Sequence, residues 1–158
     1  MKKFIYILAA VALASCANKA QNEGAETAEA VETETVETVA AADFYQPDGT
    51  VHALDNALLY APGVSVPNLT VLDFNAVWCG PCRQLTPVVE ELARDYEGRV
   101  TFVSVDVDTY GELFEAYQLG NSIPAVLILS PDGTKASYIG TDDLMPKEKF
   151  AAILDNAL

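Results

Sequence analysis

The stretch Trp78-Cys79-Gly80-Pro81-Cys82 stands where an apolar run ends and a helical pattern begins. Before it, residues 70–76 read Thr-Val-Leu-Asp-Phe-Asn-Ala, a near-continuous apolar run that is typical of a central parallel strand. After it, apolar residues recur at helical spacing, which predicts a helix that begins near Gly80. These residues are Leu85, Val88, Val89, Leu92 and Ala93. The sequence therefore predicts a buried strand, a turn that carries two cysteines, and a helix.

The position of the two cysteines indicates thiol chemistry. The first turn of a helix leaves backbone N–H groups unpaired, and the positive end of the helix dipole favours an anion there. Cys79 directly precedes the expected helix, so we expect its thiolate to be stabilised and to act as a nucleophile of low pKa. Cys82 lies one turn inside the helix, where we expect it to act as the resolving cysteine of a redox disulfide, Cys79–Cys82.

Other sites also contain two cysteines at this spacing. Half of a zinc site is one alternative, but zinc takes about four ligands and only Cys16 and His52 remain. A purely structural disulfide is a second, although closing so short a loop removes little chain entropy. Two inert thiols are a third, but Gly-Pro between the cysteines marks a turn rather than a packed core. We therefore expect no metal.

The cysteine motif and its surroundings resemble a known family. The run from Val71 to Phe74, followed by Trp78-Cys79-Gly80-Pro81-Cys82-Arg83, is similar to the active site of thioredoxins. The resemblance covers residues 44–158 and continues at Pro87, Ile123-Pro124, Gly133 and Gly140. It implies a thioredoxin fold, which is an α/β fold with a central mixed sheet flanked by helices. It also implies a protein-disulfide reductase that needs no cofactor.

Asp73 is a candidate for proton transfer. It lies inside the apolar strand, six residues before Cys79. If it is buried, its pKa is raised, and it can exchange protons with Cys82 near neutral pH. The alternative is an edge-strand aspartate that faces solvent. The resemblance favours burial, because thioredoxins carry an acid at the matching position.

The resemblance also implies the residues that contact substrate. Ile123-Pro124 matches an Ile–cis-Pro pair whose Ile backbone hydrogen-bonds an extended substrate. Trp78, Gly80 and Pro81 surround the cysteines, where Trp78 shields the thiols or is a partly buried packing residue. Gly140 allows close approach of a substrate chain or forms a turn at a strand end.

Two residues depart from the family. Asn75 stands where thioredoxins usually have an aromatic residue, and Ser104 stands where many have a lysine near the buried acid. Without that cation, a buried Asp73 is expected to titrate at higher pH. Without the aromatic residue, we expect looser packing under the cysteine turn.

The remaining elements follow from periodicity and turn residues. The predicted order is β-α-β-α-β-α-β-β-α. Strands are expected over residues 51–54, 70–76, 100–105, 125–129 and 135–139, and helices over 55–60, 80–97, 109–118 and 146–156. Asp55 and Asp108 are the expected caps of two helices, with paired acid–base or metal-binding carboxylates at Asp106 and Asp108 as the alternative. His52 is expected to have no chemical role.

The first 43 residues indicate export and attachment to a membrane. Met1-Lys2-Lys3 precedes an apolar run from Phe4 to Ala14, which is shorter than the roughly 20 residues that span a bilayer and fits a secretory signal. Leu13-Ala14-Ser15-Cys16 resembles a bacterial lipobox, which implies a signal peptide over residues 1–15 and lipidation at Cys16. Ordinary secretion with a free Cys16 is the alternative. Residues 16–43, with alternating Glu, Thr, Ala and Val, are expected to form a flexible acidic tether or a fraying helix.

Charge and compartment suggest the partners. Residues 1–15 carry Lys2 and Lys3 and no acid, so the remainder has all 23 acidic and seven of the nine basic residues, a formal charge of −16. We therefore expect no nucleic-acid binding. We expect a monomer in the bacterial cell envelope, anchored by lipid and facing the periplasm, that reduces or isomerises protein disulfides and receives electrons from a membrane protein. An oxidant that installs disulfides, or a non-catalytic interaction or chaperone module, is the alternative.

Overall fold

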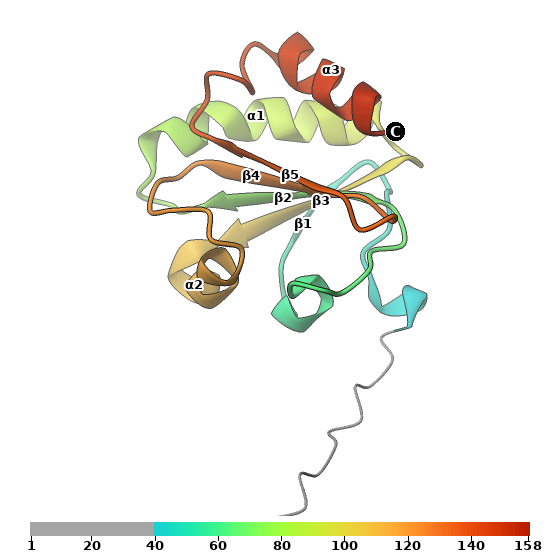
Figure 1. Ribbon diagram of the computed structural model, residues 1–158. Helices are drawn as coiled ribbons and strands as arrows, with labels where there is room; N and C mark the ends of the chain where they lie inside the picture. Colours follow the sequence, from blue (N-terminus) through green and yellow to red (C-terminus); the bar gives the residue numbers. More distant parts are fainter. Residues whose placement is uncertain (1–39) are drawn as a thin grey trace, which may run out of the picture. The chain divides into compact units, whose positions relative to one another are not determined.

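Five strands form one mixed sheet, in the order β1-β3-β2-β4-β5, in the computed structural model, which describes residues 40–158 (Figure 1). The strands are β1 Val51–Ala53, β2 Leu69–Asn75, β3 Val100–Asp106, β4 Ala125–Leu129 and β5 Lys135–Ile139. β1, β3 and β2 are parallel, whereas β4 runs antiparallel to β2 and β5 runs antiparallel to β4. β2 is therefore the central strand, as its apolar run predicted.

Helices cover both faces of this sheet. The α-helices are α1 Gly80–Asp95, α2 Val107–Ala116 and α3 Lys147–Ala157, and the short 3-10 helices are η1 Ala41–Asp43 and η2 Ala57–Tyr60. α1 and α3 lie together on one face, and α2 and η2 lie on the other (Figure 1). With η2 as the first helix, the order from β1 to α3 is the predicted β-α-β-α-β-α-β-β-α.

The two faces of β2 contact two apolar clusters. Val71 packs with Leu85 and other side chains of α1 and α3, whereas Leu72 and Phe74 pack toward α2 and η2. Successive residues of a strand point to opposite faces, so a strand that is buried on both sides must be apolar at nearly every position. Asp73 breaks this run, and its relative exposure is only 5%.

Two predicted helix caps are wrong by one or two residues. η2 is capped by Asn56, whose side chain accepts a hydrogen bond from the backbone N–H of Leu58 at 3.1 Å. The carboxylate of Asp55 instead accepts from the Tyr45 hydroxyl at 2.6 Å. This partner lies ten residues away in sequence, so local cap rules do not include it.

The second correction concerns the start of α2. Asp106, at the end of β3, accepts a hydrogen bond from the backbone N–H of Asp108 at 3.0 Å, so it is Asp106 that caps the helix. α2 consequently begins at Val107, two residues earlier than predicted, and Tyr110 departs from helical geometry with φ −119° and ψ 37°. The side chain of Asp108 does not serve as the cap and contacts Trp78 instead.

The hairpin between β4 and β5 confirms the turn prediction. Gly133 has φ +85°, a conformation that glycine adopts without steric cost, and its N–H donates to the Ser130 carbonyl oxygen at 3.0 Å. Asp132 accepts a hydrogen bond from the backbone N–H of Thr134 at 2.8 Å. The last helix begins at Lys147, with Pro146 as its N-cap.

The predicted signal peptide over 1–15, the lipidated Cys16 and most of the predicted tether lie outside the described residues. The short helix η1 and Phe44 begin the part of the chain that is described. Within residues 40–158, none of the helices has the length and apolar character needed to cross a bilayer.

Candidate active site

Cys79 and Cys82 lie at the junction between β2 and α1, where they form a disulfide with a Cα–Cα distance of 5.3 Å. Cys79 is the N-cap of α1, and its Sγ accepts a hydrogen bond from the backbone N–H of Cys82 at 3.2 Å. Gly80 and Pro81 form the first turn, and Pro81 fits there because an initial helical residue needs no N–H partner. The predicted helix start is therefore confirmed, and Cys79 contacts one of the unpaired N–H groups of that start.

The disulfide is covered by apolar side chains. Cys79 and Cys82 are only 4% and 3% exposed. They pack with Ala76, and the partly buried Val107 and Ile123 complete the cluster. In this apolar setting a charge on sulfur depends on the few N–H donors of the helix start.

The loop before β4 reaches the disulfide through Ile123. The Ile123–Pro124 peptide bond is cis, which agrees with the expectation from the resemblance. The backbone N–H of Gly140, just after β5, donates to the carbonyl oxygen of Pro124 at 2.8 Å. Gly140 has φ +83°, and a Cβ placed on it would meet no atom within 4 Å, so it forms a turn at the strand end and borders open space. Both interpretations of Gly140 are thus compatible with its geometry.

Trp78 lies on the surface beside the cysteines rather than in the packed interior. Its side chain is 63% exposed, and that of Val77 is 84% exposed. The indole Nε1–H of Trp78 donates to Oδ2 of Asp108 at 2.8 Å. The guanidinium of Arg83 donates to the carbonyl oxygen of Val77 at 3.1 Å. Asp108 and Arg83 therefore hold the Val77–Trp78 turn from two sides.

The contacts that Asp108 and Arg83 make with this turn were not predicted from the sequence. Asp108 was predicted to be a helix cap or one of a pair of carboxylates. Its position just after a strand was the one feature of the sequence that could have indicated a contact with the site. Trp78 and Asp108 are 30 residues apart in sequence. Because β2 and β3 are adjacent parallel strands in register, the segments after their carboxyl ends meet, and this pairing brings the two side chains together.

Asp73 is buried, as favoured by the resemblance, and it lies on the α1 side of β2. Burial raises its pKa from 3.8 to about 7, and a hydrogen bond from Asn75 acts in the opposite direction. Oδ1 of Asp73 has no hydrogen-bond partner among the described protein atoms. This carboxyl group can therefore change protonation near neutral pH in the layer beneath the start of α1.

Asn75 and Ser104, the two departures from the family pattern, both contact this region. Asn75 donates from Nδ2 to Oγ of Ser104 at 2.8 Å and to the Asp73 carboxylate at 3.4 Å. The predicted proximity of Ser104 to the buried acid is confirmed by the register, which pairs Ser104 with Asp73.

His52 lies away from the cysteines and contacts other residues. His52 lies on β1, stacks on the Tyr45 ring with 4.7 Å between centroids, and has Nε2 3.1 Å from Asp48. Among residues 40–158, no group of three or more His, Cys, Asp or Glu side chains is arranged to hold a metal ion.

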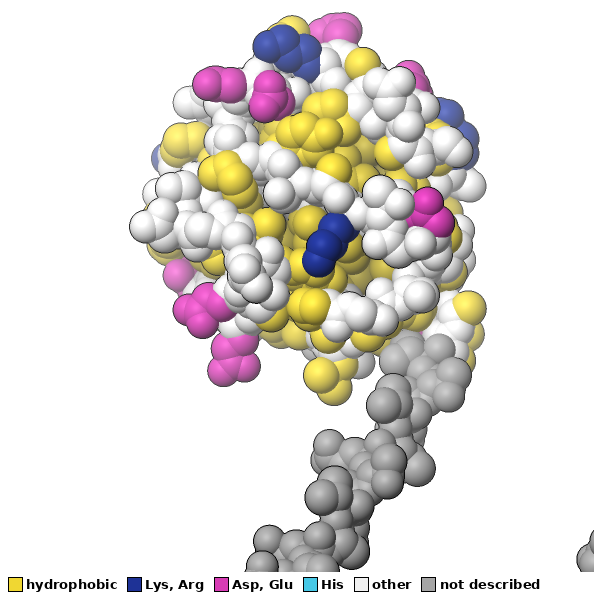
Figure 2. All heavy atoms as spheres, in the orientation of Figure 1, with side chains coloured by type: hydrophobic (Ala, Val, Ile, Leu, Met, Phe, Trp, Pro, Cys, Tyr) yellow, Lys and Arg dark blue, Asp and Glu magenta, His cyan; other side chains and the backbone are white. Residues whose placement is uncertain are grey.

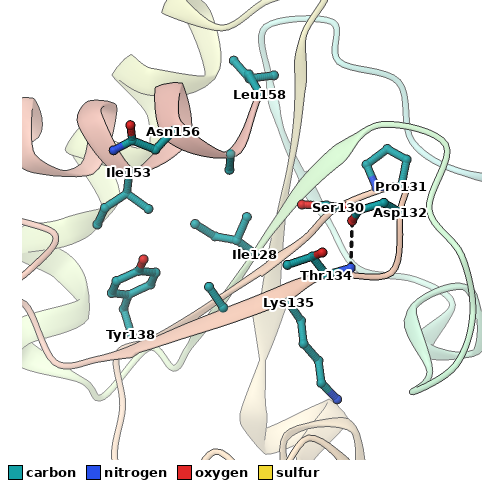
Figure 3. A pocket seen from close by; sticks show the side chains of 12 residues that line it. Ile128, Ser130, Pro131, Asp132, Thr134, Lys135, Tyr138, Ile153, Asn156 and Leu158 are labelled. Atoms are coloured by element: carbon teal, nitrogen blue, oxygen red, sulfur yellow. Dashed lines mark hydrogen bonds between the residues drawn. The ribbon is translucent and has the colours of Figure 1, made fainter.

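A groove of about 540 Å³ lies at the β5 edge of the sheet (Figure 3). It is bordered by the β4–β5 hairpin and α3, with Ile128, Tyr138 and Ile153 facing the hollow (Figure 3). Figure 2 shows hydrophobic side chains gathered near the centre of the face that carries this hairpin. In the β2–β4 register, Leu129 pairs with Thr70 at the start of β2, far from its cysteine end. The groove contains no cysteine, so it is not the site of thiol chemistry.

Comparisons with known proteins agree with the resemblance. The family model described as thioredoxin matches residues 59–156. The chloroplastic M-type thioredoxin of Zea mays is 35% identical over 120 residues, which are 76% of this chain and 62% of the maize protein. This chain therefore spans less than two thirds of the length of that relative.

Solved structures show the same arrangement of elements. The germline-specific thioredoxin Deadhead of Drosophila melanogaster is 34% identical, with a TM-score of 0.50, and the match covers 58% of this chain and 82% of that one. The thioredoxin of Trypanosoma brucei brucei is 27% identical, with a TM-score of 0.56, and the match covers 68% of this chain and 93% of that one.

Proposed function

The chain belongs to the thioredoxin family and has the thioredoxin fold, and from this premise we propose that it is a thiol–disulfide oxidoreductase acting on protein disulfides. One observation carries the proposal: Cys79 and Cys82 form a disulfide across the first turn of α1, with Cys79 at the N-cap. A purely structural crosslink does not require this position. A reactive sulfur does, because helix N–H groups stabilise its thiolate.

In the first step, the reduced protein attacks its substrate. The Cys79 thiolate forms a bond to one sulfur of a substrate disulfide, the substrate S–S bond breaks, and the other substrate sulfur leaves as a thiolate. The product is a mixed disulfide between Cys79 and the substrate. The backbone N–H of Cys82, which lies 3.2 Å from the Cys79 sulfur, stabilises the attacking anion.

In the second step, Cys82 displaces the substrate. Its thiol transfers a proton to the Asp73 carboxylate, and the resulting thiolate attacks the Cys79 sulfur. The Cys79–Cys82 disulfide forms and the second substrate sulfur leaves as a thiolate, so two electrons have passed from protein to substrate. A carboxyl group with a pKa of about 7 suits this role, because it is partly ionised at neutral pH and is still a useful proton acceptor.

The surface around the disulfide suits an extended protein segment. Exposed Trp78 and Val77 border the cysteines on one side, and Ile123 with the cis Pro124 borders them on another. Gly140 leaves open space next to the Pro124 carbonyl. Together with the half-buried Gly80 and the exposed Pro81, these residues form the proposed substrate surface.

The direction that we propose is reduction or isomerisation of protein disulfides. Gly-Pro between the cysteines supports it, because this pair resembles the reducing members of the family. The disulfide formed in each cycle must be reduced again, and a membrane protein that passes electrons outward is the proposed donor. The sequence of the first 43 residues supports a location in the bacterial cell envelope. There, a protein lipidated at Cys16 works as a tethered monomer that faces the periplasm.

The decisive experiment is reduction of insulin by dithiothreitol in the presence of the full chain. We expect acceleration by the wild-type protein and by Cys16→Ser, which keeps the active-site pair, and none by Cys79→Ser. Equal rates for wild type and Cys79→Ser would refute the enzymatic function and favour a non-catalytic interaction module. The reduction potential then separates the directions, since about −270 mV indicates a reductant and about −120 mV indicates an oxidant.

A further inference from the structure

Three polar side chains interrupt the apolar layer between the sheet and α1. Val71 on β2 and Phe102 on β3 belong to the apolar cluster under α1 and α3. Because side chains on a strand alternate between faces, Asp73, Asn75 and Ser104 lie on that same side. Asp73 pairs directly with Ser104 in the parallel β2–β3 register.

The Asn75 amide links the other two residues. Its Nδ2 lies 2.8 Å from Oγ of Ser104, 2.9 Å from the backbone oxygen of Asp73 and 3.4 Å from Oδ2 of Asp73. An amide NH₂ has two hydrogens, so three acceptors share two donors. The contact with the carboxylate is the longest of the three, and the other two set the orientation of the amide.

Asn75 is the only side chain seen to donate to the Asp73 carboxylate among the described residues. Oδ1 is buried without a partner, and the only side-chain influence on the pKa of Asp73 besides burial is the hydrogen bond from Asn75, which lowers it. The ion pairs of residues 40–158 join His52 to Asp48, and Lys147 to Glu91 and Asp95. None of them includes Asp73.

The elements packed on this face bring few titratable groups. Opposite Asp73, β4 contributes Val126 and β3 contributes Ser104, with Asp106 two residues further along β3 as the cap of α2. From β5, Tyr138 pairs with Val126. The buried side chains of α3 are Phe150 and Leu154, and its Lys147 and Lys149 bind acceptors near the surface. The buried side chains in the first two turns of α1 are Cys82 and Leu85, and Cys79 precedes them as the N-cap.

We propose that Asn75, oriented by Ser104, is a positioning residue that holds the Asp73 carboxyl group ready to accept the proton of Cys82 and so sets the rate of the resolving step. The inference rests on the proposed function and adds to it a residue whose action is confined to the second step. Asn75 is an uncharged donor, so it favours the ionised carboxylate without placing a full charge in the layer beneath α1.

The test separates the two steps of disulfide exchange. The full chain carrying Cys16→Ser, in which Cys79 and Cys82 are the only thiols, is reduced and reacts with an aromatic disulfide reagent in a stopped-flow instrument between pH 5 and 9. The first chromophoric thiolate reports the attack by Cys79, and the second reports its displacement by Cys82. The variants are Asn75→Ala and Ser104→Ala, and Asn156→Ala makes the same change as Asn75→Ala at the far end of α3.

We expect Asn75→Ala to move the pH midpoint of the second step upward by about one unit, which slows that step about tenfold at pH 6 and leaves the first step unchanged. Ser104→Ala is expected to give a smaller shift in the same direction, and Asn156→Ala none. Titration of the Asp73 carboxyl carbon by NMR should show the same displacement without any turnover.

An unchanged midpoint in the second step, or equal slowing of both steps, would overturn the role of Asn75. If Asn75→Ala does not fold, the role of Asn75 is tested by Ser104→Ala alone. The midpoint of its second step and the NMR titration of its Asp73 should then both shift upward, and an unchanged midpoint would overturn the role. Failure of the proposed function has a different signature. In that case, the wild-type first step is no faster than the reaction of an ordinary free thiol, while the NMR titration still reports whether Asn75 acts on Asp73.

Discussion

Replacing Asp73 by asparagine should stabilise the protein, and the gain should depend on pH. Burial raises the pKa of Asp73 from 3.8 to about 7. In the unfolded chain the same group ionises near pH 4. Between about pH 4 and 7 the unfolded state releases a proton that the folded state keeps, so the free energy of unfolding falls by about 1.4 kcal/mol per pH unit. The accumulated cost is about 4 kcal/mol above pH 7.

The Asp73→Asn variant does not pay this cost, because an amide of nearly the same shape stays uncharged at every pH. We expect the variant and the wild type to be similarly stable at pH 4, and the variant to be more stable by about 4 kcal/mol at pH 8. The measurement is guanidinium unfolding of the oxidised full chain from pH 4 to 8, followed by the fluorescence of Trp78, the only tryptophan.

Asp143→Asn is the matched control, since it removes one formal charge at an exposed position. It should show no comparable gain between pH 4 and 8. A difference between Asp73→Asn and wild type that is the same at pH 4 and pH 8 would refute the reasoning. So would a variant that is less stable than wild type at pH 8. Either result would mean that the carboxyl group is not held in its neutral form by burial.

Three further outcomes follow from the contacts around the site and between the helices. Asp108→Ala should remove the 2.8 Å hydrogen bond to Trp78 and change the emission of this tryptophan, with a stability loss of about 1 kcal/mol in thermal unfolding. Gly140→Val should lower the free energy of unfolding by about 1–2 kcal/mol because φ is +83°. It should also slow insulin reduction under conditions in which the variant is fully folded, and an unchanged rate for the folded variant would contradict the substrate role. Tyr96→Phe should destabilise the fold by about 1–2 kcal/mol in guanidinium, because its hydroxyl lies 2.7 Å from the Asp155 carboxylate and 3.0 Å from the Ala151 carbonyl oxygen on α3, and should leave insulin reduction unchanged.

The parts of the fold that were predictable are those in which neighbours in sequence decide the outcome. The apolar run over residues 70–76 can be buried on both faces only in the middle of a sheet, and it became the central strand β2. The helix start at Gly80 and the turn at Asp132–Gly133 depend on residues within one turn of each other, and both are confirmed. The resemblance then supplied the cis bond at Pro124, which spacing alone does not indicate.

The errors lie where several local solutions are nearly equivalent. Asp106 and Asp108 both precede a helical pattern, and either side chain is able to cap it. The choice follows from β3, which ends at Asp106, and from Trp78, which engages Asp108. Asp55 and Asn56 present the same ambiguity, which the hydroxyl of Tyr45 resolves by binding Asp55.

The sequence by itself was sufficient to place a reactive cysteine at the N-terminus of a helix, because an N-cap and the N–H groups that donate to it are close together in the chain. It was not sufficient to establish the surroundings of the second cysteine. Asn75 and Ser104 are 29 residues apart and meet only because β2 and β3 pair in register. The burial that raises the pKa of Asp73 likewise comes from packing by elements distant in sequence, since the dielectric around a carboxyl group depends on everything that excludes water from it.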